Sequence, residues 1–174
     1  MAVRLTANSF PALFERPAMS FSGKPTTLVE QQIDNDGFWP DLSVSEFQKG
    51  YRLPGEYLGE MLAADLKTAM VEVNTDLSRV KTKLQAAGIS NLEAAAGVTT
   101  PAEWAYAYKV VLYKRAVYCR AKASLLTQFA TVNRRESAEN LGKELPERSE
   151  TFLAFSQQAV RLLQGRGRIT AALL

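Results

Sequence analysis

Apolar residues recur every three or four positions from Glu56 to Ala87. This spacing places them on one face of an α-helix. The sequence therefore predicts one long amphipathic helix here, ended by Gly88, because glycine readily adopts the left-handed conformation that follows a helix. The apolar stripe consists of Leu58, Leu62, Leu66, Ala69, Val73, Leu77, Val80 and Leu84.

Two short helices are predicted from capping boxes, in which a Ser hydroxyl and a Glu carboxylate satisfy free backbone amides. Residues 43–46, Ser-Val-Ser-Glu, form one box and predict a helix to about Tyr51 that ends before Pro54. Residues 90–93, Ser-Asn-Leu-Glu, form the second and predict a helix that Gly97 ends.

A second long helix is predicted from residues 100–103, where a Thr cap, a Pro in the first turn and a Glu at the third position coincide. It should run to about Val132. Apolar residues lie on more than one of its sides, which is typical of the central helix of a bundle. They are Trp104, Tyr108, Val111, Leu112, Val117, Tyr118, Leu125 and Phe129.

A third long helix is predicted to follow Leu145-Pro146 and to run to Gln164, with Gly165 ending it. The polar residues 133–144 before it predict a loop. The expected fold class is all-α: a helical bundle with two or three long helices. The expected inward positions of the third helix are Phe152, Phe155, Ala159 and Leu162 or Leu163.

Two arms are expected to flank a helical bundle domain that spans residues 38–165. Residues 1–37 carry prolines and glycines without a helical period, so they predict an extended N-terminal arm. Short β pieces are compatible with residues 19–22 and 26–33. Residues 166–174 contain β-branched and apolar residues without a helical cap and predict a C-terminal arm.

The composition excludes the commonest kinds of chemistry. The chain of 174 residues is long enough for one domain with its own core. It contains no histidine and only one cysteine, Cys119, which excludes His-dependent nucleophilic sites, His-ligated zinc and thiolate cages. It also has no Walker-type loop and no Gly-x-Gly-x-x-Gly turn. We expect no catalytic residue, no metal site, no cofactor and no small-molecule ligand, and we expect Cys119 to fill the core.

The uncharged stretches are too short for a membrane helix. Residues 1–14 lack the features of a secretory signal. We therefore expect a cytosolic protein without membrane contact.

Seven basic residues and no acidic ones lie between Trp104 and Arg135. Such a bias suits contact with DNA or with an acidic partner subunit. At 100° per residue these side chains form no single stripe, so the alternative is that their stems cover a crowded helix and only the charged heads reach water. Both interpretations stay open. The residues considered for DNA or partner contact are Lys109, Arg115, Arg120, Lys122, Arg134 and Arg135.

The C-terminal arm is basic and apolar, because no acidic residue follows Thr151. Exposed apolar side chains are unfavourable in water, so the arm is expected to dock onto a partner protein. Folding back onto its own bundle is the alternative. The hypothesised contact residues are Arg166, Arg168, Ile169, Leu173 and Leu174.

Aromatic residues are expected to pack the chain internally or at subunit contacts. Phe38, Trp39 and Pro40 stand directly before the first helix and should hold the chain against the bundle. Tyr113 and Tyr118 are expected to lie in the core or at a helix interface.

Several segments occur in an order and spacing that resemble the phage head-completion protein L family of contractile-tailed temperate phages. The resemblance covers about residues 33–170, and the family has no catalytic motif. The similar segments are Asp36-Gly37-Phe38-Trp39-Pro40-Asp41, Tyr51-Arg52-Leu53, Ala69 with Val71-Glu72-Val73-Asn74, Ala87-Gly88, and Tyr113-Lys114-Arg115-Ala116-Val117-Tyr118 with Ala121, Ala123, Ser124 and Leu125.

The resemblance implies a structural virion protein that is added after DNA packaging and assembled in the host cytoplasm. Its implied place is the head–tail junction, in a homo-oligomeric, dodecameric ring whose C-terminal arms reach the portal. The implied partners are the portal protein, a neck or tail-completion protein, and genomic DNA passing through without sequence-specific contact. The alternative is a basic helical DNA-binding or DNA-packaging factor. A metal-free enzyme that uses carboxylates is a third class, for which the sequence offers no candidate.

Overall fold

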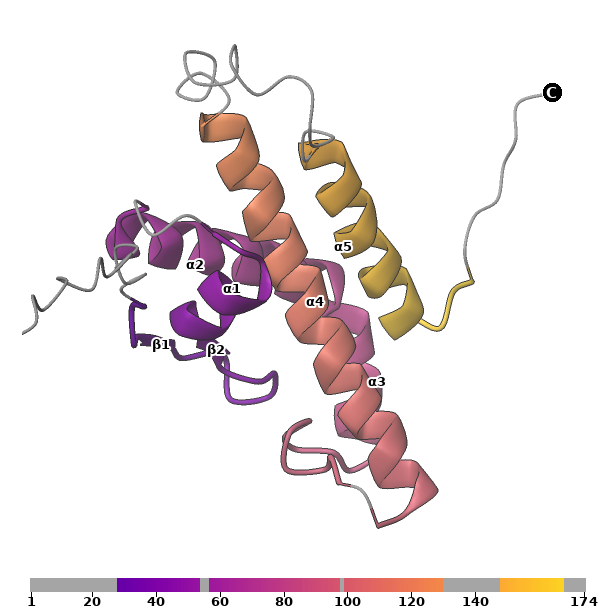
Figure 1. Ribbon diagram of the computed structural model, residues 1–174. Coiled ribbons are helices and arrows are strands. Elements are labelled where there is room, and N and C mark those ends of the chain that lie inside the picture. Colours follow the sequence, from indigo (N-terminus) through magenta and orange to yellow (C-terminus); the bar gives the residue numbers. More distant parts are fainter. Residues whose placement is uncertain (1–27, 54–56, 98, 130–147, 168–174) are drawn as a thin grey trace, which may run out of the picture.

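The computed structural model describes residues 28–53, 57–97, 99–129 and 148–167. These residues are mainly helical, which confirms the predicted all-α class (Figure 1). The predicted β piece at 19–22 and the predicted loop at 133–144 lie outside the described residues.

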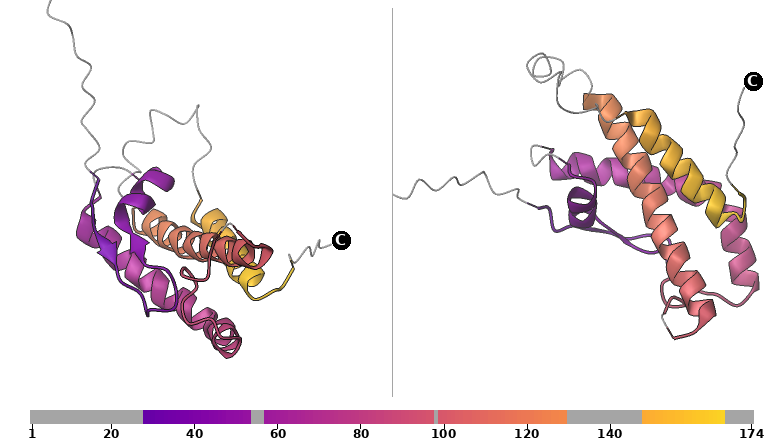
Figure 2. Two further views of the ribbon diagram at one scale, coloured as in Figure 1. Left: turned by 90° about the horizontal axis from the view of Figure 1, so that it is seen from below. Right: turned by 45° about the vertical axis from the view of Figure 1, so that its right-hand side comes forward.

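The described fold consists of helices and one small β-ribbon. In Figures 1 and 2, α4 and α5 lie side by side and antiparallel, while α2 and α3 lie on another side of α4. The elements are β1 Gln32–Ile33, β2 Leu42–Ser43, α1 Val44–Gly50, α2 Gly59–Asp76, α3 Ser78–Ala86, α4 Pro101–Phe129 and α5 Ser149–Leu163.

Helix α4 starts where the sequence predicts it. The backbone N–H of Glu103 donates to Oγ1 of Thr100 at 3.2 Å. In return, Oε2 of Glu103 accepts from the backbone N–H groups of Thr99 and Thr100, at 3.0 and 3.1 Å. The capping box is therefore complete and satisfies free donors at the helix start.

The prediction of one helix from Glu56 to Ala87 is wrong, because the chain forms two helices that diverge at Leu77 (Figure 1). Leu77 has a φ of −101° and a ψ of 7°, and its side chain is 0% exposed. The side-chain amide of Gln164, just after α5, donates to the backbone oxygen of Asp76 at 3.1 Å. Tertiary contacts thus bury the residue at the break and satisfy a carbonyl at the end of α2, where no Gly or Pro marks the position.

The apolar stripe predicted for this region nevertheless faces the core over most of its length. Val80 and Leu84 of α3 pack partly buried against the core, and Leu58, before α2, is exposed. The fully inward positions are Leu62, Leu66, Ala69, Val73 and Leu77.

The first capping box is only half formed. The backbone N–H of Glu46 donates to Oγ of Ser43 at 3.3 Å, which confirms the start of α1. The Glu46 carboxylate does not turn back to the start of the helix. It accepts instead from Nζ of Lys114 and from the hydroxyl of Tyr118, both on α4 and both at 3.1 Å.

The second short helix, predicted over 90–97, is wrong, because this segment forms hydrogen-bonded turns. Oδ1 of Asn91 accepts from the backbone N–H of Ala94 at 2.8 Å, so Asn91 takes the capping role expected of Ser90. The backbone N–H of Leu92 donates to the oxygen of Phe38 at 3.0 Å, which ties the turns to the segment before α1.

A short antiparallel ribbon joins residues before α1 to the core. Ile33 of β1 pairs with Leu42 of β2, and both side chains are buried. The strand expected within residues 26–33 is thus confined to Gln32–Ile33 in the described part. Its partner strand belongs to the same chain.

Helix α5 covers α4 with small and apolar side chains. Ser156 is fully buried, and its hydroxyl donates to the backbone oxygen of Ala116 on α4 at 2.7 Å. Ala159 and Leu163 face inward, whereas Leu162 is exposed, so Leu163 is the inward residue of that pair. Gly165 has a φ of 73°, the left-handed value expected after the helix.

Candidate interaction surfaces

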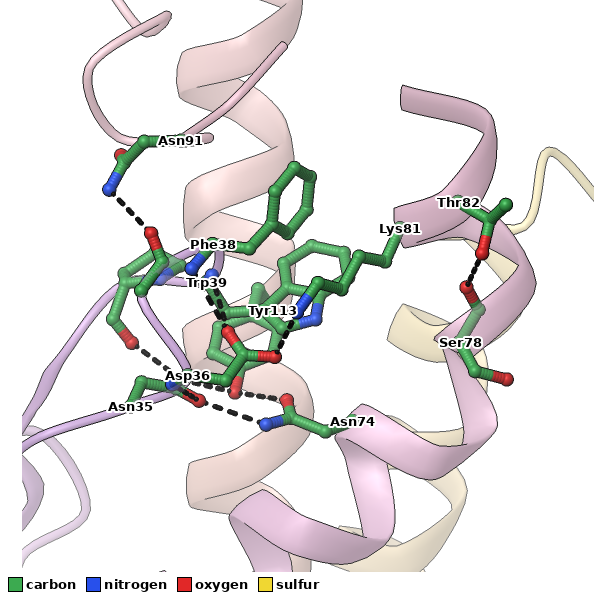
Figure 3. Close-up of polar contacts among 12 residues, drawn as sticks. Asn35, Asp36, Phe38, Trp39, Asn74, Ser78, Lys81, Thr82, Asn91 and Tyr113 are labelled. Atoms are coloured by element: carbon green, nitrogen blue, oxygen red, sulfur yellow. Dashed lines mark hydrogen bonds and ion pairs between the residues drawn. The ribbon is translucent and has the colours of Figure 1, made fainter. Parts of the chain in front are cut away.

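The aromatic residues before α1 pack against α4. The Trp39 ring stacks on the Tyr113 ring with 4.8 Å between centroids and an interplanar angle of 2°. Phe38 meets Trp39 edge-on, with centroids 4.9 Å apart (Figure 3). Pro40 and Tyr113 are buried as well. These residues therefore hold the N-terminal part of the described chain against the bundle.

A closed ring of hydrogen bonds lies beside this aromatic stack (Figure 3). Nδ2 of Asn35 donates to the hydroxyl of Tyr113 at 2.7 Å, and that hydroxyl donates to Oδ1 of Asn74 at 2.7 Å. Nδ2 of Asn74 then donates to Oδ1 of Asn35 at 2.9 Å. Neither asparagine stood out in the sequence, because a polar residue before a turn or on a helix is usually exposed. The network joins the loop, α2 and α4.

Asp36 fixes the turn that follows this ring. Its Oδ1 accepts from the backbone N–H groups of Phe38 and Trp39, at 3.0 and 3.1 Å, and its Oδ2 accepts from Nζ of Lys81 at 2.7 Å. Burial alone would raise the pKa of the Asp36 carboxyl. The Lys81 ammonium and the two amides outweigh burial and lower this pKa below its ordinary value of 3.8.

Tyr118 forms a second internal cluster, with α1. Its ring stacks on Phe47 with 5.5 Å between centroids. Burial is the main cause that raises the pKa of the phenols of Tyr118, Tyr113 and Tyr51. These phenols therefore stay protonated and act in the structure as hydrogen-bonding groups.

Two basic residues of α4 that were considered for DNA or partner contact have partners inside the chain. Arg120 lies 2.8 Å from the carboxylate of Asp76 and 3.5 Å from that of Glu72. Lys122 is only 3% exposed, its Nζ donates to the backbone oxygen of Tyr51 at 2.8 Å, and it lies 4.4 Å from the centroid of the Phe152 ring. Both residues hold helices together.

Other predicted basic residues lie nearer the surface. Nζ of Lys109 lies 4.8 Å from the centroid of the Tyr106 ring, and the Arg115 guanidinium lies 5.3 Å from that of Phe155. Arg115 is exposed, as is Arg166 after α5. The predicted site residues Arg134, Arg135, Arg168, Ile169, Leu173 and Leu174 lie outside the described residues.

The first half of α4 carries a stripe of large exposed apolar side chains that sequence reasoning assigned to the interior. Trp104 is 64% exposed, Tyr108 58% and Val111 61%. Their spacing of four and three residues places them on one side of the helix. We call these three residues the α4 stripe. The charged and exposed Arg115, four residues after Val111, continues the same side.

A cavity of about 570 Å³ lies at the end of the α4 stripe, between α1, α4 and α5. Its walls combine aromatic rings with cations, and Glu46 is its only acidic residue among those described. Cys119 also lines it, where burial raises the pKa of the thiol although Arg115 and Lys122 act in the opposite direction. Walls of this composition can bind a partner side chain. The other lining residues include Tyr51, Arg52, Lys114, Arg115, Tyr118, Lys122, Phe152 and Phe155.

Neither a metal centre nor a membrane span can be assigned to the described parts of the chain. No cluster of three or more Cys, Asp or Glu side chains there is arranged to hold a metal ion. None of the described helices is both long and apolar enough to cross a membrane.

Comparisons with known proteins give a consistent result. The family described as phage head completion protein (GPL) matches residues 33–174. A probable head completion/stabilization protein of Haemophilus phage HP1 (strain HP1c1) is 32% identical over 154 residues, which cover 88% of this chain and 99% of that protein. No solved structure matches.

Proposed function

The chain belongs to the phage head completion protein (GPL) family, and from this premise we propose that it assembles as a ring under the portal and joins the DNA-filled head to the neck or tail. The membership makes it a structural head completion protein and a component of a phage virion. Ring formation, portal contact and contact with a neck or tail-completion protein are the proposal. The protein acts through contacts with other subunits and catalyses no reaction.

The α4 stripe is the observation that carries the proposal. The fold already has a core built from all its layers, yet three large side chains of its longest helix are more than half exposed. An exposed contiguous apolar patch is unfavourable in water and is typical of protein interfaces. The exposure of these side chains is explained if a neighbouring subunit covers them when the protein assembles.

The proposed portal contact is the C-terminal arm. The described chain ends in exposed residues after α5, and Arg161 donates to the backbone oxygen of Gly167 at 2.9 Å, which fixes the start of the arm. We propose that the arm contacts the portal through basic and apolar side chains. Several copies in a ring would multiply a weak contact into a tight one. The proposed contact residues are Arg166, Arg168, Ile169, Leu173 and Leu174.

Deleting residues 168–174 tests the portal contact. This truncation keeps Gly167 and its contact with Arg161, so the circular dichroism spectrum should equal that of the full chain. Cosedimentation with purified portal rings should be lost. If the truncated chain cosediments with portal rings as well as the full chain does, the proposed role of the arm is wrong.

The alternative, a DNA-binding factor, is less well supported by the structure. Arg120 and Lys122 are engaged within the chain, which leaves fewer cations of α4 for phosphate groups. A DNA-binding factor should bind duplex DNA with an affinity that falls steeply as salt rises, because binding releases counterions. Tight binding to a duplex of random sequence near physiological salt would favour this alternative.

A further inference from the structure

The α4 stripe and a hollow between α2 and α3 lie on opposite sides of the molecule. Helix α2 packs on the side of α4 that carries Tyr113, whose hydroxyl contacts Asn74 of α2. At about 100° per residue, Tyr113 is roughly opposite Trp104 on the helix. Figure 2 likewise shows α2 and α3 on one side of α4.

The hollow has a volume of about 440 Å³ and is open to solvent. Val71 of α2, which is 60% exposed, forms its apolar wall. Most of the remaining wall consists of hydroxyl and amide groups, several of which appear in Figure 3. We call it the α2–α3 hollow; its residues are Asp36, Val71, Asn74, Thr75, Ser78, Lys81, Thr82 and Gln85.

We propose that the α4 stripe of one copy inserts into the α2–α3 hollow of the next copy, and that this pair of surfaces forms the contact between subunits. This inference rests on the proposed ring, and it specifies which two sides of neighbouring subunits contact each other. It commits to a second copy of this chain as the occupant, because the described residues provide both halves of the contact.

The chemistry of the two surfaces matches. Tyr and Trp side chains have an apolar body and one polar tip, so they suit a site that is apolar on one side and polar on the other. In the hollow, Val71 offers the apolar contact. The hydroxyls of Thr75 and Ser78 line the same space and can pair with the phenol of Tyr108.

Charge favours the same pairing. Lys114 and Arg115 lie beside the end of the stripe, whereas Glu72, which follows Val71 on α2, keeps a carboxylate that is 55% exposed although Arg120 lies 3.5 Å from it. Opposite charges across a contact favour the correct partner.

A different groove, at the end of α5, is mostly basic. It is lined by Arg79, Lys83, Lys109 and Arg166, with Asp76 as the acidic residue among those described. Inserting the α4 stripe there would bring cations of two copies together, which disfavours this groove as the site.

Two different surfaces on opposite sides of one subunit give a head-to-tail contact. Such contacts repeat from subunit to subunit and close into a ring when the rotation per subunit allows it. A contact of the α4 stripe with itself would instead stop at a dimer. Duplex DNA is a poor occupant of the stripe, because phosphates and sugar edges offer little apolar area to cover Val111.

Thiol cross-linking in purified phage heads tests the pairing. All variants carry Cys119→Ser, so that the native thiol cannot react. Val71→Cys, Tyr108→Cys and the double variant with both changes are then treated with a flexible bifunctional thiol reagent. The double variant should give a ladder of multimers on a denaturing gel. Heads that contain a mixture of the two single variants should give dimers but no ladder.

Three results would overturn the inference. Dimers of Tyr108→Cys alone would show that the stripe pairs with itself. Heads that contain the protein but yield no cross-link in the double variant or in the mixture would reject the contact while leaving the proposed function intact. Absence of the unaltered chain from the heads would reject the proposed function together with the inference.

A second measurement does not depend on the reach of the reagent. Tyr108→Lys and Val71→Glu place a charge on each surface, and each should reduce incorporation into heads by at least tenfold. Leu153→Glu is the matched control, because Leu153 is an exposed apolar residue of α5 outside both surfaces. Equal incorporation of all three folded variants, checked by circular dichroism, would contradict the proposal.

Discussion

Single side chains at the junction before α1 join parts of the chain that are far apart in the sequence. Asn35 lies 39 positions before Asn74 and 78 positions before Tyr113 in the sequence. The polar groups of the three residues nevertheless meet in one ring of hydrogen bonds. A partly buried network of this kind is most stabilising when all its members are satisfied. Its residues are therefore sensitive to small changes.

Replacing Tyr113 with Phe should lower the free energy of unfolding by about 1–3 kcal/mol, because the ring still stacks on Trp39 but Asn35 and Asn74 lose a partner. Urea unfolding measures this change. The control is Tyr108→Phe on the exposed side of the same helix, with an expected change below about 0.5 kcal/mol. Equal effects of the two variants would contradict the role given to the network.

The Asp36 carboxyl should make the free energy of unfolding depend on pH. Its pKa is lowered in the folded state, so the carboxylate stabilises the fold above its ordinary pKa of 3.8, and this contribution is lost as pH falls through the lower folded value. Asp36→Asn should therefore be less stable than the unaltered chain near neutral pH, and the difference should shrink below pH 3.8. Thermal unfolding at several pH values measures it. Lys81→Gln should reduce the same pH dependence, and a difference that stays constant with pH would contradict this account.

At the level of helices, the sequence predicts where most elements start but not every break. The boxes at Ser43 and Thr100 are local signals, because the cap and the amide it satisfies lie within one turn, and both starts are confirmed. The break at Leu77 has no local signal, since Leu77 keeps the apolar spacing of the stripe. It depends on burial of that side chain and on Gln164, which lies 88 positions from the carbonyl it binds.

Leu77→Ala should lower the free energy of unfolding by about 2–5 kcal/mol, because it leaves a cavity at the point where α2, α3 and α5 meet. Val71→Ala, on the exposed side of α2, is the control and should change it by less than about 0.5 kcal/mol. Chemical unfolding of both variants provides the comparison. A loss for Leu77→Ala no larger than that of the control would show that the break does not depend on this side chain.

At the level of the whole molecule, the sequence predicts a helical bundle and the aromatic residues that close it, but not which side of α4 faces outward. The α4 stripe has the composition of a core, and periodicity alone cannot distinguish a helix face covered within the chain from one left for a partner. The α2–α3 hollow could not be predicted either, because it exists only where two helices diverge at an unsignalled break. Both parts of the proposed contact thus arise from tertiary structure.

The proposed function requires the protein to assemble on the portal. Electron microscopy of the full chain mixed with purified portal rings measures it most directly. We expect an added ring of density on one end of the portal, with α4 of each copy directed towards α2 and α3 of its neighbour. Portal rings that remain bare at saturating concentrations of the chain, or single copies bound without contact to one another, would contradict it.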